Sequence, residues 1–187
     1  MTLNAPVDLL VVDDDHEFRE TLNSRFGNRG FQVQCAANGE EALGLAARRT
    51  FDVAIFDMMM PGMSGLELLK RFKAQHSDCE VILLTGQGTI ETAVEAMKQG
   101  AYDYLQKPFP LKDLEVVAAK ACDRRRLRKE NAQLKSLLER SRPPSQMVGE
   151  SPSMREVYRL IERAGPSDKA ILIQGESGTG GSDSRKE

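Results

Sequence analysis

Cysteine is scarce in this chain, and the three cysteines present form no CxxC pair. Cys35, Cys79 and Cys122 are odd in number and widely spaced, so they indicate neither a disulfide framework nor a zinc site. We interpret them as ordinary thiols of a protein that works in a reducing cytoplasm.

Long hydrophobic runs and a strong charge of either sign are also missing. No apolar run is long enough to cross a bilayer, and the first residues lack the basic start and apolar stretch of a signal peptide. The formal net charge of -2, with 29% charged residues, gives no reason to expect nucleic acid or an anionic membrane as a partner. We therefore expect a cytoplasmic protein whose 187 residues suffice for one well-packed domain and an appendage.

What the first two-thirds of the chain does contain is a strict alternation of two kinds of segment. The segments between the apolar runs place apolar residues at helical spacing, as Phe18, Leu22 and Phe26 do. Five strand–helix units in alternation predict an α/β domain with a doubly wound, five-stranded parallel sheet. Short apolar runs rich in β-branched residues predict its buried strands at Val7–Val12, Phe31–Cys35, Val53–Phe56, Val81–Leu84 and Tyr102–Leu105.

The last helix of this domain is predicted to begin near Leu111 and to continue to about Arg140 as a C-terminal helical linker. Its spacing of four, three and four residues is typical of a short coiled-coil seam and favours a homodimer over a single solvated helix. The seam consists of Leu127, Asn131, Leu134 and Leu138. A run of basic residues in the same helix is interpreted as a solvated face, because no base-reading motif accompanies it. The run comprises Arg124, Arg125, Arg126, Arg128 and Lys129.

Acidic residues, a hydroxyl and a lysine follow the predicted strands where these end. In a doubly wound sheet such strand ends meet at one rim. Clustered carboxylates without histidine or cysteine suit a hard divalent ion, Mg²⁺ first, and a lysine with a hydroxyl suits an incoming phosphoryl group. Each residue alone has a plain structural explanation, as Asp15 does as a helix N-cap, but together they predict a site for phosphoryl transfer. The set is Asp13, Asp14 and Asp15 after the first strand, Asp57 after the third, Thr85 after the fourth and Lys107 after the fifth.

Four segments at these strand ends resemble the signature segments of response-regulator receiver domains, in order and with that family's spacing. They are Leu10–Asp14, Phe56–Gly65, Leu83–Gly86 and Tyr104–Phe109. The resemblance implies a flavodoxin-like receiver fold in which Asp57 is the phosphoacceptor. It also implies that Asp14, Asp57 and the main-chain carbonyl of Met59 bind Mg²⁺, while Asp13 acts largely through metal-bound water.

The resemblance implies roles for three further residues and a partner. Lys107, joined to Pro108 by a cis peptide bond, contacts the phosphoryl oxygens, and Thr85 hydrogen-bonds the phosphoryl group. Tyr104 is the switch aromatic that moves inward as Thr85 is drawn toward Asp57. The donor is a phosphohistidine on a cognate histidine kinase, and the expected output is a change in a dimer formed through the linker helix, a receiver face or both.

Residues 147–180 resemble the opening of the ATPase domain in NtrC-like activators of the alternative sigma factor, sigma-54. The glycines of its phosphate loop correspond to Gly175, Gly178 and Gly180, but the position of the phosphate-binding lysine holds Gly181 and no Walker B acid follows. We therefore expect no ATP hydrolysis and no enzyme activity beyond self-phosphorylation. Sigma-54 RNA polymerase and DNA would be partners only of a full-length protein.

The expected organisation is a receiver domain at 5–122, a helical linker at 123–142, an incomplete ATPase segment at 147–180 and a tail of unclear origin at 181–187. The expected function is that of a two-component response regulator that controls transcription. Two alternatives remain at this stage. One is a nucleotide-binding ATPase fragment, and the other is a phosphohydrolase with an aspartate nucleophile, which would require a second acid where Met59 stands.

Overall fold

The computed structural model describes residues 7–86, 88–140 and 151–164. The chain divides into two compact units, Met1–Ala132 and Gln133–Glu187, which are described separately. The first unit contains strands β1 (Val7–Val12), β2 (Phe31–Ala36), β3 (Val53–Asp57), β4 (Glu80–Thr85) and β5 (Asp103–Gln106). Its helices are α1 (His16–Gly27), α2 (Gly39–Ala46), α3 (Gly65–Gln75), α4 (Ile90–Lys98) and most of α5 (Leu111–Arg140).

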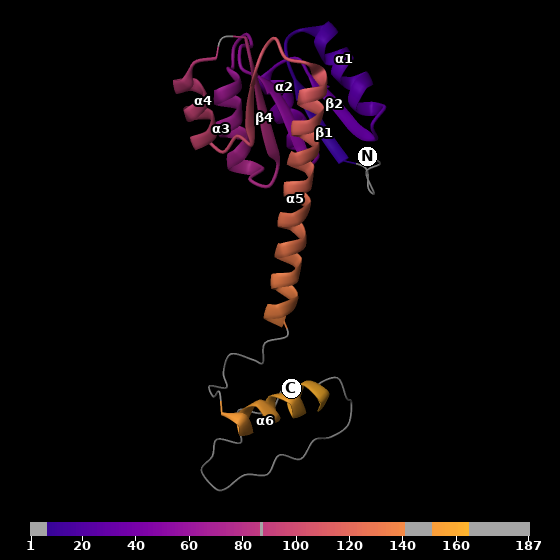
Figure 1. Ribbon diagram of the computed structural model, residues 1–187, viewed down its shortest axis with the longest axis vertical. Helices are drawn as coiled ribbons and strands as arrows, with labels where there is room; N and C mark the ends of the chain where they lie inside the picture. Colours follow the sequence, from indigo (N-terminus) through magenta and orange to yellow (C-terminus); the bar gives the residue numbers. More distant parts are fainter. Residues whose placement is uncertain (1–6, 87, 141–150, 165–187) are drawn as a thin grey trace. The chain divides into compact units, whose positions relative to one another are not determined.

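The five strands form one parallel sheet, as predicted, and their order is β2-β1-β3-β4-β5 (Figure 1). All residues of β3 and β4 are buried, because helices cover both faces of the sheet. The chain winds outward from β1 in both directions, to β2 on one side and to β3 on the other. The carboxyl ends of β1 and β3 therefore lie side by side at the point where strand order reverses, which is where sheets of this kind bind ligands.

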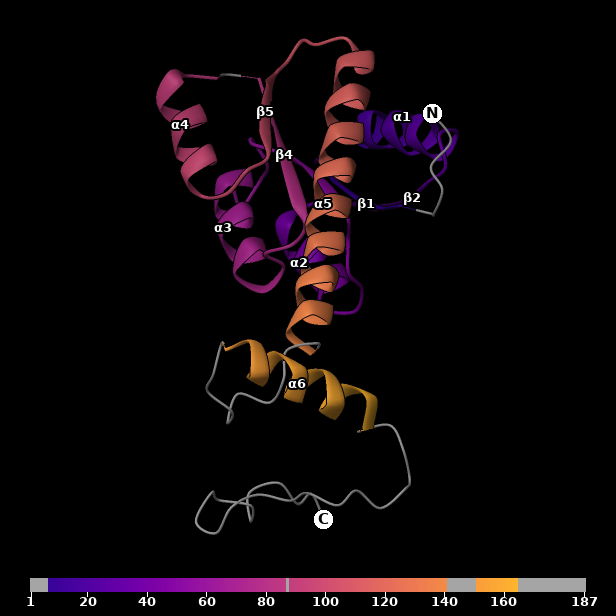
Figure 2. The same ribbon diagram turned by 60° about the horizontal axis from the view of Figure 1, so that its bottom comes forward.

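Successive residues of a strand point to opposite faces of the sheet and pack in two separate hydrophobic cores. Leu10 and Val12 of β1 pack in the core under α2, α3 and α4, where Phe56 and Phe72 meet edge-on at 5.2 Å between ring centroids. Leu9 and Val11 face the other core, under α1 and α5. Figure 2 shows α1 and α5 next to each other on that side. Both faces of the sheet are therefore apolar and buried, which requires helices on both sides, as in a doubly wound fold.

Short polar side chains begin the helices that follow the strands. Asp15 accepts hydrogen bonds from the main-chain N–H groups of Glu17 and Phe18, which confirms its predicted place as the N-cap of α1. Asn38 caps α2 and Ser64 caps α3 in the same way. These caps start each helix within a few residues of the carboxyl end of the preceding strand.

The basic residues of α5 form a largely exposed face, as predicted, and three of them also pair with acids at the amino ends of the strands. Glu80, the first residue of β4, is only 2% exposed, and its Oε1 lies 3.5 Å from Arg124 Nε and 3.2 Å from Arg128 Nη1. Arg125 pairs with Asp52, whose other carboxylate oxygen accepts the main-chain N–H of Asp8 at 2.7 Å. Three of the five basic residues thus hold α5 against the amino ends of the strands.

The helix predicted from Leu111 to about Arg140 is confirmed as α5. Leu127 and Leu134 of the proposed seam are 59% and 60% exposed, and Asn131 is exposed as well. The side chain of Leu138 lies outside the described residues. The homodimer therefore remains a prediction, with two exposed leucines consistent with it.

In the second unit α6 (Pro152–Ala164) follows Ser151, whose hydroxyl accepts the N–H of Met154 at 3.3 Å. The phosphate-loop glycines Gly175, Gly178 and Gly180 lie outside the described residues. Among the described helices, none combines the length and the apolar character needed to cross a membrane.

One glycine permits the close approach of α3 to the end of β3. The Gly65 N–H donates to Met58 O at 3.0 Å, and a Cβ added at Gly65 would lie 2.1 Å from Asp57 O and 2.8 Å from Met58 Cα. Those neighbours are main-chain atoms and cannot move aside without displacing the strand end. Any side chain at 65 would therefore disturb the rim of the sheet.

We predict that Gly65→Ala lowers the free energy of unfolding by at least about 2 kcal/mol, because its methyl group overlaps the main chain of β3. Gly44→Ala is the matched control, since nothing lies within 4 Å of a Cβ at that position in α2. That control should stabilise the protein by about 0.5–1 kcal/mol through the usual helix preference of alanine. Urea unfolding measures both, and equal effects of the two substitutions would contradict the proposed contact.

We also predict that Glu80→Gln destabilises the protein by about 1–2 kcal/mol, because it removes a buried carboxylate with two guanidinium partners. Glu67→Gln serves as the control, since its pair with Arg71 is about half exposed on both sides and should contribute only about 0.3 kcal/mol. If the two substitutions shift the urea midpoint equally, Glu80 does not anchor α5.

Candidate functional site

Two buried carboxylates and one lysine meet at the carboxyl edge of the sheet. Asp13 directly follows β1, Asp57 ends β3 and Lys107 directly follows β5. The Nζ of Lys107 lies 2.6 Å from Asp57 Oδ1 and 2.9 Å from Asp13 Oδ2. The side chains of Asp57 and Asp13 are 7% and 2% exposed, and that of Lys107 is 31% exposed. The structure thus brings together three residues that the sequence analysis placed at one rim.

Each carboxylate also accepts a hydrogen bond from the main chain two residues further on. Met59 N–H donates to Asp57 Oδ2 at 2.7 Å, and Asp15 N–H donates to Asp13 Oδ1 at 2.9 Å. The loop after β3 is held in turn by the N–H of Met58, which donates to Leu84 O at 2.7 Å. Both carboxylates are therefore fixed through both oxygens, one on an ammonium group and one on an amide.

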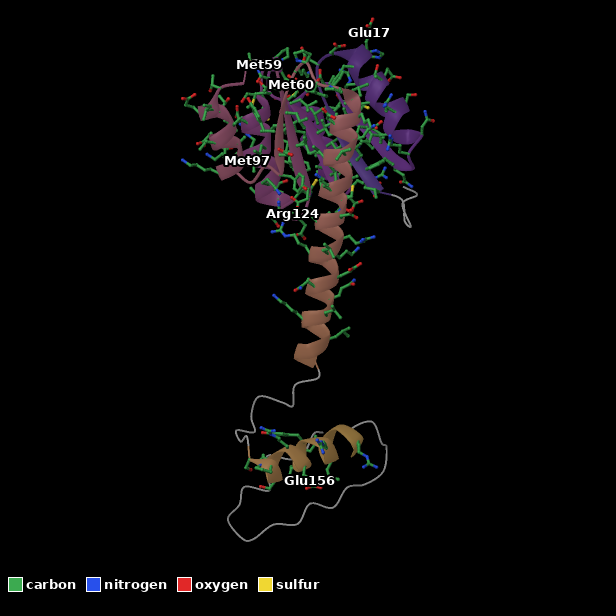
Figure 3. All side chains as sticks on the ribbon, viewed as in Figure 1. Glu17, Met59, Met60, Met97, Arg124 and Glu156 are labelled. Carbon is green, nitrogen blue, oxygen red and sulfur yellow. The ribbon has the colours of Figure 1, made fainter. Side chains whose placement is uncertain are left out.

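The other two predicted metal ligands lie beside this centre. Asp14 is exposed, and the side chain of Met59 is 65% exposed next to Asp57. Figure 3 shows Met59 at the same end of the domain as Glu17, and Arg124 at the opposite end. This end of the domain therefore presents a buried, charged centre with an exposed acid and an exposed methionine at its edge.

Thr85 and Lys107 are joined through the main chain. Thr85 ends β4 and is 1% exposed, and its carbonyl oxygen accepts the N–H of Lys107 at 2.6 Å. The peptide bond between Lys107 and Pro108 is cis, which confirms the expectation drawn from the resemblance. The end of β5 is thus tied to the end of β4, next to the strand that carries Asp57.

Tyr104, the predicted switch aromatic, lies in β5 and packs, half-buried, against the core under α2, α3 and α4. Its hydroxyl is 3.3 Å from the Oγ1 of Thr92 in α4. Sequence reasoning missed Thr92, although a threonine three residues after the N-cap residue Thr89 is a capping pattern that could have indicated it.

Phe18 and Arg19 of α1 also border the centre, and the sequence analysis assigned neither of them to the site. Lys107 Nζ lies 4.6 Å from the ring centroid of Phe18, so the aromatic face covers one side of the ammonium group. The guanidinium of Arg19 donates to the main-chain oxygen of Asp13 at 2.6 Å. Phe18 fits the apolar stripe of α1 equally well, so its sequence position gives no signal of this second contact.

The charges at the centre do not balance. Burial raises the pKa of the Asp13 carboxyl above its ordinary value, although hydrogen bonds from Lys107 and Asp15 act in the opposite direction. Burial pulls the pKa of Lys107 down, but its hydrogen bonds to Asp57 and Asp13 outweigh burial and leave that pKa raised. One ammonium group therefore faces two buried carboxylates, with the exposed Asp14 adding further negative charge.

The donor chemistry fits a hard divalent cation, since the acids offer oxygen ligands and carry more negative charge than Lys107 balances. In the arrangement described, Lys107 lies between Asp13 and Asp57. Among the described residues no three histidine, cysteine, aspartate or glutamate side chains are already grouped to hold a metal ion. The charge and the oxygen ligands of the carboxylates thus suit a divalent cation. In the side-chain positions described, it is the Lys107 ammonium group that lies between them.

Comparison with known proteins identifies the relatives of this chain. The chain is 39% identical over 170 residues to the DNA-binding transcriptional regulator NtrC of Salmonella typhimurium, covering 91% of this chain and 35% of that protein. It is 37% identical over 172 residues to the regulatory protein AtoC of Escherichia coli, covering 92% and 37%. It is also 35% identical over 175 residues to the nitrogen assimilation regulatory protein NtrX of Azorhizobium caulinodans, covering 92% and 38%. The chain thus spans little more than a third of these curated relatives.

Solved structures give the same result. NtrX from Brucella abortus in complex with ATP has a TM-score of 0.66 and 32% identity, covering 94% of this chain and 38% of that one. A response regulator receiver domain protein from Clostridium thermocellum has a TM-score of 0.61 and 33% identity, covering 65% and 98%. The resemblance to NtrC-like regulators is therefore confirmed. The family model for the response regulator receiver domain matches residues 9–119, more than half of the chain, and the chain belongs to that family.

Proposed function

We propose that this chain is the receiver end of a two-component response regulator and that Asp57 accepts a phosphoryl group from a histidine kinase in the cytoplasm. The observation that carries the proposal is the shared contact of Lys107 with Asp57 and Asp13 at the reversal point of the sheet. The family match supports the same role for this centre.

We assign Asp57 as the nucleophile in line with the family match, and it is the more exposed of the two buried acids, with 7% of its side chain exposed against 2% for Asp13. Asp57 has Oδ1 on the Lys107 ammonium group and Oδ2 on the Met59 amide, so its carboxylate is oriented by two fixed donors. A phosphoryl group added there would lie beside the same lysine, which then pairs with the phosphoryl oxygens.

The transfer moves one electron pair at each end of the phosphoryl group. A carboxylate oxygen of Asp57 forms a new bond to phosphorus while the bond from phosphorus to the imidazole nitrogen breaks, and the freed imidazole keeps that electron pair. Lys107 neutralises charge on the phosphoryl oxygens, and the hydroxyl of Thr85 is the proposed donor to one of them. Positioning and electrostatic stabilisation supply the catalysis.

Mg²⁺ is the cofactor that we propose for this site. Asp13, Asp14, Asp57 and the main-chain carbonyl of Met59 are the residues that would hold it. When bound, the ion neutralises negative charge on the transferring group. The excess of carboxylates over ammonium groups is the observation that supports this assignment.

The output that we propose is a shift of α4, β5 and α5 between two pre-existing arrangements, with Thr85 and Tyr104 as switch residues. Because α5 continues from the domain into the linker, the shift can change a homodimer formed through Leu127, Asn131, Leu134 and Leu138, through a receiver face, or through both. We propose sigma-54 RNA polymerase and DNA as partners only of a longer protein. The proposed segments 5–122, 123–142, 147–180 and 181–187 would be a part of that protein. We propose no membrane partner.

An ATPase function is not proposed for this chain. The Brucella abortus relative is described in complex with ATP, but here Gly181 stands where the phosphate-binding lysine is expected, after Gly175, Gly178 and Gly180. Glycine offers neither charge nor a side-chain donor to nucleotide phosphates. A phosphohydrolase function is disfavoured because Met59 occupies the place of the second acid.

Asp57→Asn is predicted to abolish phosphorylation, because the amide removes the attacking carboxylate. Incubation with acetyl phosphate and Mg²⁺ followed by intact mass spectrometry should show one phosphoryl adduct on the wild type and on Asp123→Asn. The latter removes an exposed acid that lies in α5, outside the centre. An adduct on Asp57→Asn as abundant as on the wild type would refute the assignment of the acceptor.

Asp13→Asn is predicted to stabilise the protein at pH 7 and to weaken its response to Mg²⁺. The folded pKa of Asp13 lies above its ordinary value, so the stability linked to its protonation is present at low pH and is lost as the pH rises through that pKa. The urea midpoint of the variant should therefore exceed that of the wild type at pH 7, and the difference should narrow toward about pH 4, the ordinary pKa of aspartate.

Added Mg²⁺ should raise the midpoint of the wild type more than that of Asp13→Asn, because the ion stabilises the folded state that binds it. Asp14→Asn is the matched control. Asp14 is exposed, so its substitution should weaken the Mg²⁺ response without the stabilisation at pH 7. A variant Asp13→Asn that is less stable than the wild type at pH 7 would show that the ionised carboxylate stabilises the fold.

A further inference from the structure

Three hydroxyl groups meet at the amino end of α4. Thr89 is the N-cap of this helix, and its hydroxyl accepts the main-chain N–H of Thr92 at 3.2 Å. The Oγ1 of Thr92 lies 3.1 Å from Thr89 N and 2.9 Å from Thr89 O, which closes a reciprocal capping box. The hydroxyl of Tyr104 reaches the same Oγ1 from β5, at 3.3 Å.

The hydrogen and lone pairs of the Thr92 hydroxyl indicate whether Thr92 or Tyr104 donates. A threonine hydroxyl has one hydrogen and two lone pairs. The hydrogen of Thr92 is directed to the carbonyl oxygen of Thr89, and one lone pair accepts the N–H of Thr89. Where the two hydroxyls are bonded, Tyr104 is therefore the donor and the remaining lone pair of Thr92 is the acceptor. The hydroxyl of Thr89 is the competitor for that lone pair, since it also lies 3.3 Å from Thr92 Oγ1.

The ring of Tyr104 is placed by a close contact with the loop before α4. A Cβ added at Gly88 would lie 2.6 Å from the Tyr104 hydroxyl oxygen and 3.2 Å from both Tyr104 Cε1 and Thr85 Cγ2. Tyr104 and Thr85 thus lie against the same point of main chain, which is free of a side chain. A displacement of Thr85 would therefore act on the tyrosine ring at this point. The tyrosine hydroxyl in turn contacts Thr92.

Few other contacts fix α4 to the domain. Ala96 is its one buried residue among the described positions, whereas α3 buries Gly65, Leu68, Leu69 and Phe72. The outer residues Ile90, Val94 and Met97 of α4 are between 47% and 81% exposed. A helix with so small a buried face is sensitive to the loss of a single hydrogen bond at its cap.

We infer that Thr92 is the positioning residue that couples the ring of Tyr104 to the N-cap of α4, so that a change at Asp57 and Thr85 reaches α4 through this hydroxyl. The inference rests on the proposed phosphorylation of Asp57 and adds the residue that passes the change on to the helix. Thr92 acts through Tyr104 and contacts neither Asp57 nor Lys107 among the hydrogen bonds and ion pairs described.

The test compares amide NMR spectra of the full chain before and after phosphorylation with excess acetyl phosphate and Mg²⁺. In the wild type, phosphorylation should shift the amide signals of α4. Thr92→Val and Tyr104→Phe each remove one hydroxyl. The loss of one hydrogen bond of ordinary net strength changes an equilibrium constant roughly two- to tenfold, so each variant should clearly reduce the α4 shift changes. Because both variants break the same bond, the double variant should show no further reduction.

Tyr104→Phe leaves the capping box of Thr89 and Thr92 intact and so separates coupling from helix capping, and two controls test the need for the Thr92 hydroxyl. Thr92→Ser keeps the hydroxyl and should restore the α4 response. Thr21→Val removes a comparable hydroxyl, which donates to Glu17 O four residues earlier in α1 at 2.9 Å, and should leave the response unchanged. Mass spectrometry of each sample reports the phosphoryl adduct itself.

The outcomes are distinguishable. A wild type without an adduct would overturn the proposed function together with this inference. An adduct with α4 shift changes in Thr92→Val equal to those of the wild type would overturn this inference alone. Additive effects in the double variant, or a response lost equally in Thr92→Ser, would overturn it as well.

Discussion

The structure depends on one lysine ammonium group held between two buried carboxylates at the carboxyl edge of a parallel sheet. Lys107 reaches Asp57 and Asp13 at 2.6 and 2.9 Å, and the second oxygen of each carboxylate is fixed by a main-chain N–H. This arrangement requires β1, β3 and β5 to end at the same level, which a parallel sheet provides. It also sets one lysine against two buried carboxylates, with the exposed Asp14 beside them.

A second ionic cluster lies at the opposite edge of the sheet, where α5 is held. Glu80 and Asp52 stand at or just before the amino ends of β4 and β3 and pair with arginines of α5. Nearer its start, α5 is joined to α1 by the buried Glu115, which pairs with Arg25 and Arg29 at 2.5 and 2.6 Å. The helix that leaves the domain is thereby anchored to strands whose other ends carry the charged centre. The same strands thus contact both the charged centre and α5.

The strands, their order and the meeting of Asp13, Asp57 and Lys107 were predictable from the sequence. Buried parallel strands produce short apolar runs, and the doubly wound topology brings their carboxyl ends together. The ion pairs of the α5 arginines were not predicted, because their partners Glu80 and Asp52 are distant in sequence and become neighbours only in the fold. Thr92 and Phe18 were missed for a related reason, since a capping threonine and an apolar helix residue have sufficient local explanations. The roles of the site residues do not follow from their placement and remain proposals.

The central claim is that this charged centre binds a divalent ion through acids from separate loops. Titration of the full chain with Mg²⁺, followed by amide NMR, tests it most directly. The account predicts one saturable set of shift changes shared by the residues around Asp13, around Asp57 and Met59, and around Lys107. Spectra without a saturable change, or with changes confined to residues away from this edge of the sheet, would contradict it.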